Sequence, residues 1–246
     1  FGIVSADYSR GAYDGIKESP EYWGGSASLA VVTELLRNHP GTVSHLYLTV
    51  GIENTLAETD LFPDAHSPKI WYESNPHAGL VMRSGRDWQF GLTYGAFTSP
   101  NGQFGSSQEI AFTTRYQGES LMMDRLKPQA KIAVPVFEGK GVYTELSVAP
   151  GFRPLPDSDF QLTFPVVFGM GINDYYGAEK SSPVYGSIGL VGSLPLKMVP
   201  SDYGAWSFSA GAFLLVRETA LAEAGRPLDD AGNMVVYGSA SLSFVF

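Results

Sequence analysis

The stretch MVVYGSASLSFVF, residues 234–246, alternates apolar side chains with hydroxyl-bearing ones in steps of two. One face carries Val236, Gly238, Ala240, Leu242, Phe244 and Phe246, and the other carries Tyr237, Ser239, Ser241, Ser243 and Val245. Successive side chains of a β-strand point to opposite faces, so this period predicts a strand whose two faces meet different surroundings. The rest of the chain has to show which surroundings each face meets.

The same period of two recurs along the whole chain. In residues 160–172, FQLTFPVVFGMGI, seven large apolar side chains share one face, and the opposite face is mostly small or polar. Helical periodicity is nearly absent, so SLMMDRLK (120–127) and ETALAEAG (218–225) are expected to form turns or single helical turns. The sequence predicts an all-β chain of one domain over 1–246, with about twelve strands. The expected strands are 1–9, 26–36, 43–54, 70–83, 87–98, 106–117, 129–137, 141–152, 160–172, 183–194, 204–216 and 234–246.

Composition excludes several classes of protein. The net charge is -9 and no block of basic residues stands out, so nucleic acid is not an expected partner. The chain has no cysteine, which excludes a disulfide scaffold. No run of about 18 apolar residues is present, so no transmembrane helix is expected.

Two architectures fit twelve amphipathic strands: a soluble β-sandwich and a membrane barrel. The polar strand faces carry Ser, Thr, Gly and Gln more than Lys and Glu, whereas the water-exposed face of a sandwich is usually charged. The strands are about 9–13 residues long, and about 9–11 tilted residues cross a bilayer, whereas strands of globular proteins average about 5–6. Both observations favour a closed antiparallel transmembrane β-barrel.

Aromatic residues and connectors agree with the barrel interpretation. Seven aromatic residues fall near one predicted rim: Trp88, Tyr116, Phe160, Tyr203, Trp206, Phe244 and Phe246. Tyr72, Tyr175 and Tyr176 fall near the other rim, with Tyr94 a little inside it. Aromatic rings at both interfaces are expected for membrane barrels. Short and long connectors mostly alternate, with exceptions at 118–128 and 138–140.

The C-terminal strand resembles that of bacterial outer-membrane β-barrel proteins, because Phe246 is terminal and Phe244 and Leu242 keep the alternation. In that class such a signature is recognised by the machinery that inserts barrels. The resemblance implies that Phe246, Phe244 and Leu242 form an assembly signal, that membrane lipid and the barrel-assembly machinery are partners, and that the protein resides in the bacterial outer membrane.

The faces predicted to point inward carry mixed charges and several aromatic residues. Twelve tilted strands give a backbone radius of roughly 12 Å, which leaves a narrow channel for small polar solutes. The charged groups could instead pair across the interior and make it rigid. The candidate lining residues are Glu34, His45, Tyr47, Glu53, His77, Arg83, Glu109, Arg115, Lys131, Tyr143 and Glu145.

Three roles remain open for such a barrel. Passive passage of small polar solutes is the first, and a structural or accessory barrel that partners another envelope protein is the alternative. A lipid-acting enzyme needs a serine and a histidine on one strand face, and none of the four histidines has a serine two residues away. No HExxH motif or EF-hand loop is present, so no catalytic residue, metal or cofactor is predicted.

Overall fold

A computed structural model describes residues 2–4, 8–9, 12–13, 24–37, 43–56, 67–118, 126–137, 139–155, 157–176, 182–224 and 232–246. The short strands are β1 (Gly2–Val4), β2 (Tyr8–Ser9), β3 (Ala12–Tyr13), β11 (Gly151–Phe152) and β12 (Gln161–Thr163). The longer strands are β4 (Gly24–Arg37), β5 (Val43–Leu56), β6 (Trp71–Ser84), β7 (Trp88–Phe97), β8 (Ser107–Tyr116), β9 (Gln129–Pro135), β10 (Val142–Val148), β13 (Val166–Ile172), β14 (Val184–Pro195), β15 (Ala205–Arg217) and β16 (Met234–Val245). The helices with described bounds are η2 (Ser201–Tyr203) and α2 (Thr219–Ala224).

One antiparallel sheet contains fourteen of the strands, in the order β11-β12-β14-β13-β10-β9-β8-β7-β6-β5-β4-β1-β16-β15. In addition, β14 pairs with β15 over eleven residue pairs, from Tyr185 with Arg217 to Pro195 with Ser207. The three-residue strand β1 pairs with both β4 and β16. The prediction of an antiparallel all-β chain is confirmed.

Most predicted strand ends lie within two residues of the observed ones. Two predicted strands are each interrupted by a proline: 141–152 divides into β10 and β11 around Pro150, and 160–172 divides into β12 and β13 around Pro165. Proline has no N–H to donate to a ladder, so pairing stops there. The predicted strand 1–9 is described only at β1 and β2, and most of 120–127 lies outside the described residues.

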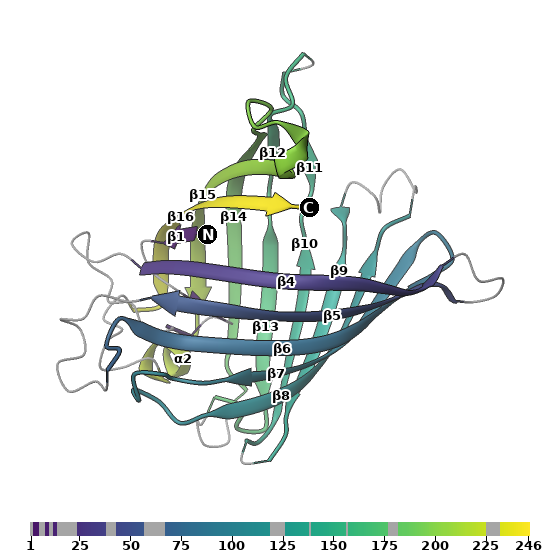
Figure 1. The fold of residues 1–246 in the computed structure, drawn as a ribbon. Coiled ribbons are helices and arrows are strands. Elements are labelled where there is room, and N and C mark those ends of the chain that lie inside the picture. The colour runs from purple at the N-terminus through teal and green to yellow at the C-terminus, as the bar shows by residue number, and fades with distance from the viewer. Residues whose placement is uncertain are drawn as a thin grey trace.

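The sheet is strongly curved, so that β4 to β8 cross in front of β10, β13 and β14 in Figure 1. A cavity on its concave side is lined by side chains of ten strands, from Glu53 of β5 to Tyr237 of β16. We call the face that lines this cavity the inner face and the opposite one the outer face. We call the end where β4 passes to β5 the short-connector end, and the end that carries α2 the long-connector end.

The outer face is apolar and exposed. Cross-strand pairing places one row of large side chains across five neighbouring strands, and each is 37–52% exposed. The row consists of Leu48, Leu80, Leu92, Phe112 and Ile132. Further strands continue this surface with Leu146, Phe168, Ile188, Leu190 and Phe208. Monomeric soluble proteins rarely expose contiguous apolar surface on this scale, so this face needs an apolar environment.

Glycines on the inner face lie beneath aromatic rings of the adjacent strand. Gly169 of β13 pairs with Tyr185 of β14, and Gly189 of β14 pairs with Phe213 of β15. A Cβ at either glycine would overlap the ring of its partner. Inward side chains of a curved sheet are crowded, so a residue without a side chain accommodates each large neighbour.

Gly169→Val should lower the free energy of unfolding by about 1–3 kcal/mol, because the Tyr185 ring must leave its place over the glycine. Urea unfolding in detergent micelles measures this change. Gly105→Val is the matched control, since a Cβ there meets no atom within 4 Å and the change should stay within about 0.5 kcal/mol. Equal losses for both variants would contradict the packing described for Tyr185.

Aromatic side chains gather at the short-connector end. Trp88 packs against Tyr116 with ring centroids 5.3 Å apart, and Trp206 stacks on Phe244 at 4.9 Å. Tyr72, Tyr175 and Tyr176, predicted near the opposite rim, lie at the long-connector end, at the start of β6 and just after β13. Tyr72 is only 8% exposed, and Tyr175 and Tyr176 pack against the buried interior cluster. The rings of Tyr175 and Tyr176 therefore lie against the interior cluster, and the ring of Tyr72 packs on Phe104.

Two connectors at the short-connector end are joined by an ion pair between Asp159 and Lys197. The hydrogen bond from Lys197 holds the pKa of Asp159 below its ordinary value of 3.8, with a smaller effect from the charge of Arg153. A lowered carboxyl pKa stabilises the folded state above the unfolded pKa, and this contribution disappears as the pH falls through the folded pKa. NMR titration should give an Asp159 midpoint below 3.8 that rises in Lys197→Gln, and an unchanged midpoint would contradict the pairing.

Candidate functional site

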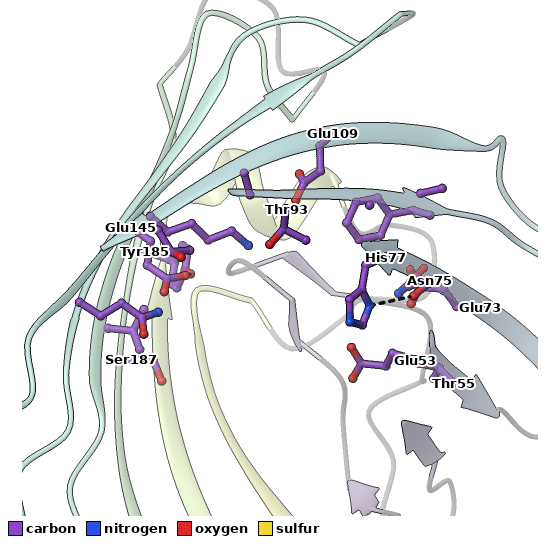
Figure 2. A pocket seen from close by; sticks show the side chains of 18 of the residues that line it. Glu53, Thr55, Glu73, Asn75, His77, Thr93, Glu109, Glu145, Tyr185 and Ser187 are labelled. Carbon is purple, nitrogen blue, oxygen red and sulfur yellow. Dashed lines mark hydrogen bonds between the residues drawn. The ribbon is translucent and has the colours of Figure 1, made fainter. Parts of the chain in front are cut away.

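The interior cavity has a volume of about 640 Å³ and is lined by polar and charged side chains. Figure 2 shows two walls across an open space, with Glu145, Tyr185 and Ser187 on one side and His77, Asn75 and Glu73 on the other. Four carboxylates and one ammonium group line it: Glu53, Glu73, Glu109, Glu145 and Lys131. Glu73 and Glu109 are 5% and 7% exposed, so charge is buried inside the protein while the outer face is apolar.

Tyrosine hydroxyls hold the carboxylates of one wall. The Tyr143 hydroxyl donates to Glu145 Oε2 at 2.6 Å and lies 2.6 Å from the Tyr185 hydroxyl. The Tyr175 hydroxyl donates to Glu109 Oε2 at 3.3 Å. These donors are neutral, so they fix the positions of the carboxylates without cancelling their charge. The Lys131 ammonium lies 5.8 Å from the centre of the Tyr143 ring and adds one positive charge to the wall.

Helix α2 covers the interior at the long-connector end. Its Leu221 is fully buried, and it belongs to the same cluster as Tyr143, Tyr185 and Leu215. The segment is tied at both ends by Arg217, which donates two hydrogen bonds to the Gly232 carbonyl at 2.9 and 2.8 Å. The buried Leu221 side chain therefore narrows the interior at this end.

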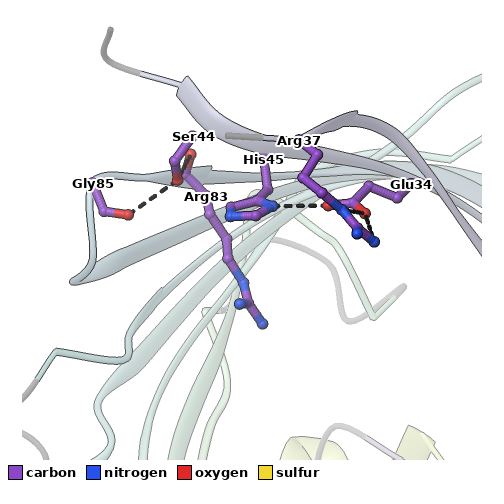
Figure 3. Close-up of polar contacts among 6 residues, drawn as sticks. All are labelled: Glu34, Arg37, Ser44, His45, Arg83 and Gly85. Carbon is purple, nitrogen blue, oxygen red and sulfur yellow. Dashed lines mark hydrogen bonds and ion pairs between the residues drawn. The ribbon is translucent and has the colours of Figure 1, made fainter. Parts of the chain in front are cut away.

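A second polar cluster lies at the short-connector end (Figure 3). Glu34 Oε1 lies 2.8 Å from His45 Nδ1, and its Oε2 accepts from Arg37 Nε at 2.6 Å. The His45 ring stacks on Tyr47 at 6.0 Å, and the Arg83 guanidinium lies 5.8 Å from the centre of the Tyr47 ring. Glu34 thus joins β4 to β5 through His45, and the Arg83–Tyr47 contact joins β6 to β5.

The structure brings five of the predicted lining residues together around the cavity: Glu53, His77, Glu109, Lys131 and Glu145. Tyr143 lies in the cavity wall, fully buried. Tyr47 and Arg83 line a smaller hollow, and Arg115 lines another with Lys127. Glu34 and His45 contact each other between the neighbouring strands β4 and β5, and not across the interior.

Leu221 and Phe137 differ from what the strand pattern indicates, whereas Glu73 follows it. Glu73 lines the cavity, as its odd residue number, shared with His77 and Arg83 on the same strand, indicates. Leu221 lies in a short connector helix that no strand period could reveal. Phe137 continues the inward-facing odd positions of β9, but it is 84% exposed because β9 ends at Pro135.

Within the described part of the chain, no helix is long and apolar enough to span a membrane. The same residues contain no group of three His, Cys, Asp or Glu side chains that could hold a metal ion. The fold and the cavity define an antiparallel all-β protein with charged groups inside and apolar groups outside. Neither protein-family models nor curated proteins give a match to the chain, so no family assignment accompanies this description.

Proposed function

We propose that the sheet closes into a twelve-stranded barrel that spans the bacterial outer membrane and passes small polar solutes. The pairing of β14 with β15 and the pairings of β1 with β4 and β16 support closure. If β10 and β11 count as one strand, and β12 and β13 as another, twelve strands each have a neighbour on both sides. Closure removes unpaired strand edges, which hydrocarbon does not tolerate.

The observation that carries the proposal is the inverted polarity of the fold. Large apolar side chains on the outer face are 37–52% exposed in the row from Leu48 to Ile132, whereas Glu73 and Glu109 are nearly buried inside. A soluble sandwich has the opposite arrangement, because its apolar faces pack against each other. Strands of ten to fourteen residues, such as β4 and β7, are also long enough to cross a bilayer when tilted.

The volume and the polar lining of the cavity limit which solutes could pass. A volume of about 640 Å³ lined by carboxylates, hydroxyls and amides suits ions and small polar solutes. The proposal assigns no catalytic step, because among the described residues neither His45 nor His77 hydrogen-bonds to a serine. On this account membrane lipid surrounds the outer face, and the barrel-assembly machinery recognises the strand that carries Leu242, Phe244 and Phe246.

A second candidate is an accessory barrel without a passage, which partners another envelope protein. One observation favours it: Leu221 and Ala222 of α2 are buried at the long-connector end and narrow the interior. The two candidates predict different electrical behaviour.

Ion conductance across a planar bilayer separates them. Purified protein should produce steady unitary currents if solutes pass, and inserted protein that stays electrically silent would contradict the channel. Insertion must be shown independently, for example by protection of the strands from added protease. Silence with proven insertion would favour the accessory role.

A further inference from the structure

We infer that the proposed channel rectifies ionic current, because acidic and basic side chains of its interior are separated along the axis. The inference rests on the proposed function and extends it to small inorganic ions of both signs. Cations would enter preferentially at the long-connector end and anions at the short-connector end.

The separation is visible on single strands, where position along the axis follows from residue number. On β5, the single acidic residue, Glu53, lies near the long-connector end. On β6, Glu73 lies near the long-connector end and Arg83 lies at the short-connector end. On β8, Glu109 and Arg115 repeat the arrangement. At about 3.3 Å per residue these acid–base pairs are about 20–33 Å apart along the strand.

Location confirms that these groups face the interior. Glu53, Glu73 and Glu109 line the main cavity, whereas Arg83 and Arg115 line the two hollows toward the short-connector end. Glu53, Arg83 and Arg115 form no ion pair with another described residue. Arg115 Nε donates to the neutral Gln129 at 3.0 Å, so its charge is retained.

Each end of the interior also carries charges of the opposite sign. These charges reduce the difference in charge between the two ends without removing it. At the basic end Glu34 is held by Arg37 and His45. At the acidic end Arg217 shares the inner face with Tyr185, but it is 3% exposed and donates to the Gly232 carbonyl, so its guanidinium is covered by protein and does not contact ions in the passage. Lys131 pairs in register with Glu145 between the two zones.

Rectification follows from ion accumulation. A positive potential on the acidic side drives cations into the acidic zone and anions into the basic zone, so both carriers accumulate inside and current is large. The opposite potential empties the region between the zones. Side chains act on ions across about one Debye length, which is about 10 Å in 0.1 M salt and about 3 Å in 1 M salt. The asymmetry should therefore be large in dilute salt and small in concentrated salt.

The test is the current–voltage curve of single channels in about 0.1 M and about 1 M KCl. Current should be about two-fold larger when the long-connector side is positive, and the ratio should approach one in concentrated salt. Because the chain has no cysteine, Asp202→Cys in η2 and a membrane-impermeant thiol reagent on one side identify the orientation of each channel.

Variants that remove charge give the decisive comparison. The double variant Glu53→Gln with Arg83→Gln should lower the current ratio toward one while conductance persists, because Glu73, Glu109 and Arg115 remain, and Asp202→Asn on the exposed connector should leave the ratio unchanged. A symmetric curve in dilute salt, or one that is larger with the opposite polarity, would overturn the inference and leave the channel intact. Absence of any current would instead contradict the proposed function.

Discussion

Leu92→Arg should lower the free energy of unfolding in lipid vesicles by about 2–4 kcal/mol, whereas Thr93→Arg should cost less than about 1 kcal/mol. The two residues are neighbours on β7 and point to opposite faces. Leu92 is 52% exposed in the middle of the apolar row, and Thr93 lines the cavity with the carboxylates. An arginine at 92 would place a guanidinium in acyl chains, whereas at 93 it reaches a polar interior.

Urea unfolding of vesicle-inserted protein measures both changes. A third variant, Leu92→Ala, controls for lost packing and should cost less than Leu92→Arg. Equal losses for the arginine variants at 92 and 93 would contradict the assignment of the faces. A larger loss at 93 would reverse that assignment and place β7 in a soluble sandwich.

Leu221→Asp should raise single-channel conductance by about two-fold or more, because a carboxylate cannot remain in the apolar cluster and α2 must withdraw. In the folded protein the Leu221 side chain is completely buried, and it packs in one cluster with Leu215 and Tyr185. Withdrawal of α2 widens the interior at its narrow end. The measurement is unitary conductance in a planar bilayer.

Two further variants make this result interpretable. Leu221→Ala shortens the side chain without adding charge and should give a smaller increase. Glu218→Gln changes an exposed residue just before α2 and should leave conductance unchanged. If Leu221→Asp inserts normally but conducts like the unmodified chain, α2 does not narrow the passage.

Most of the sheet could be predicted from the sequence because the two faces of each strand differ in polarity. The strand from Met234 to Val245 shows this, since its serines share a face with Tyr237 of the cavity wall. The interruptions at Pro150 and Pro165 were harder to place, because proline ends pairing locally without changing the period. The alternation of side chains between the two strand faces was enough to place a set of residues on the interior face: Glu53, His77, Glu109, Lys131 and Glu145.

The tertiary arrangement of the interior could not be predicted in the same way. The contact of Tyr175 with Glu109 joins residues 66 positions apart and depends on how the turn after β13 folds inward. Leu221 enters the interior from a connector, where no period exists to indicate burial. Strand alternation reports which face a residue occupies, and it carries no information about segments that fold into the space between strands.

Nitroxide scanning of β7 shows which face of the strand meets lipid, since single cysteines can be introduced into a chain that has none. In lipid vesicles, labels at 90, 92 and 94 should be accessible to oxygen dissolved in the bilayer, and labels at 89, 91 and 93 to a water-soluble nickel reagent. Access to each reagent should therefore alternate along the strand with a period of two. Equal access of the nickel reagent to labels on both faces would contradict this alternation.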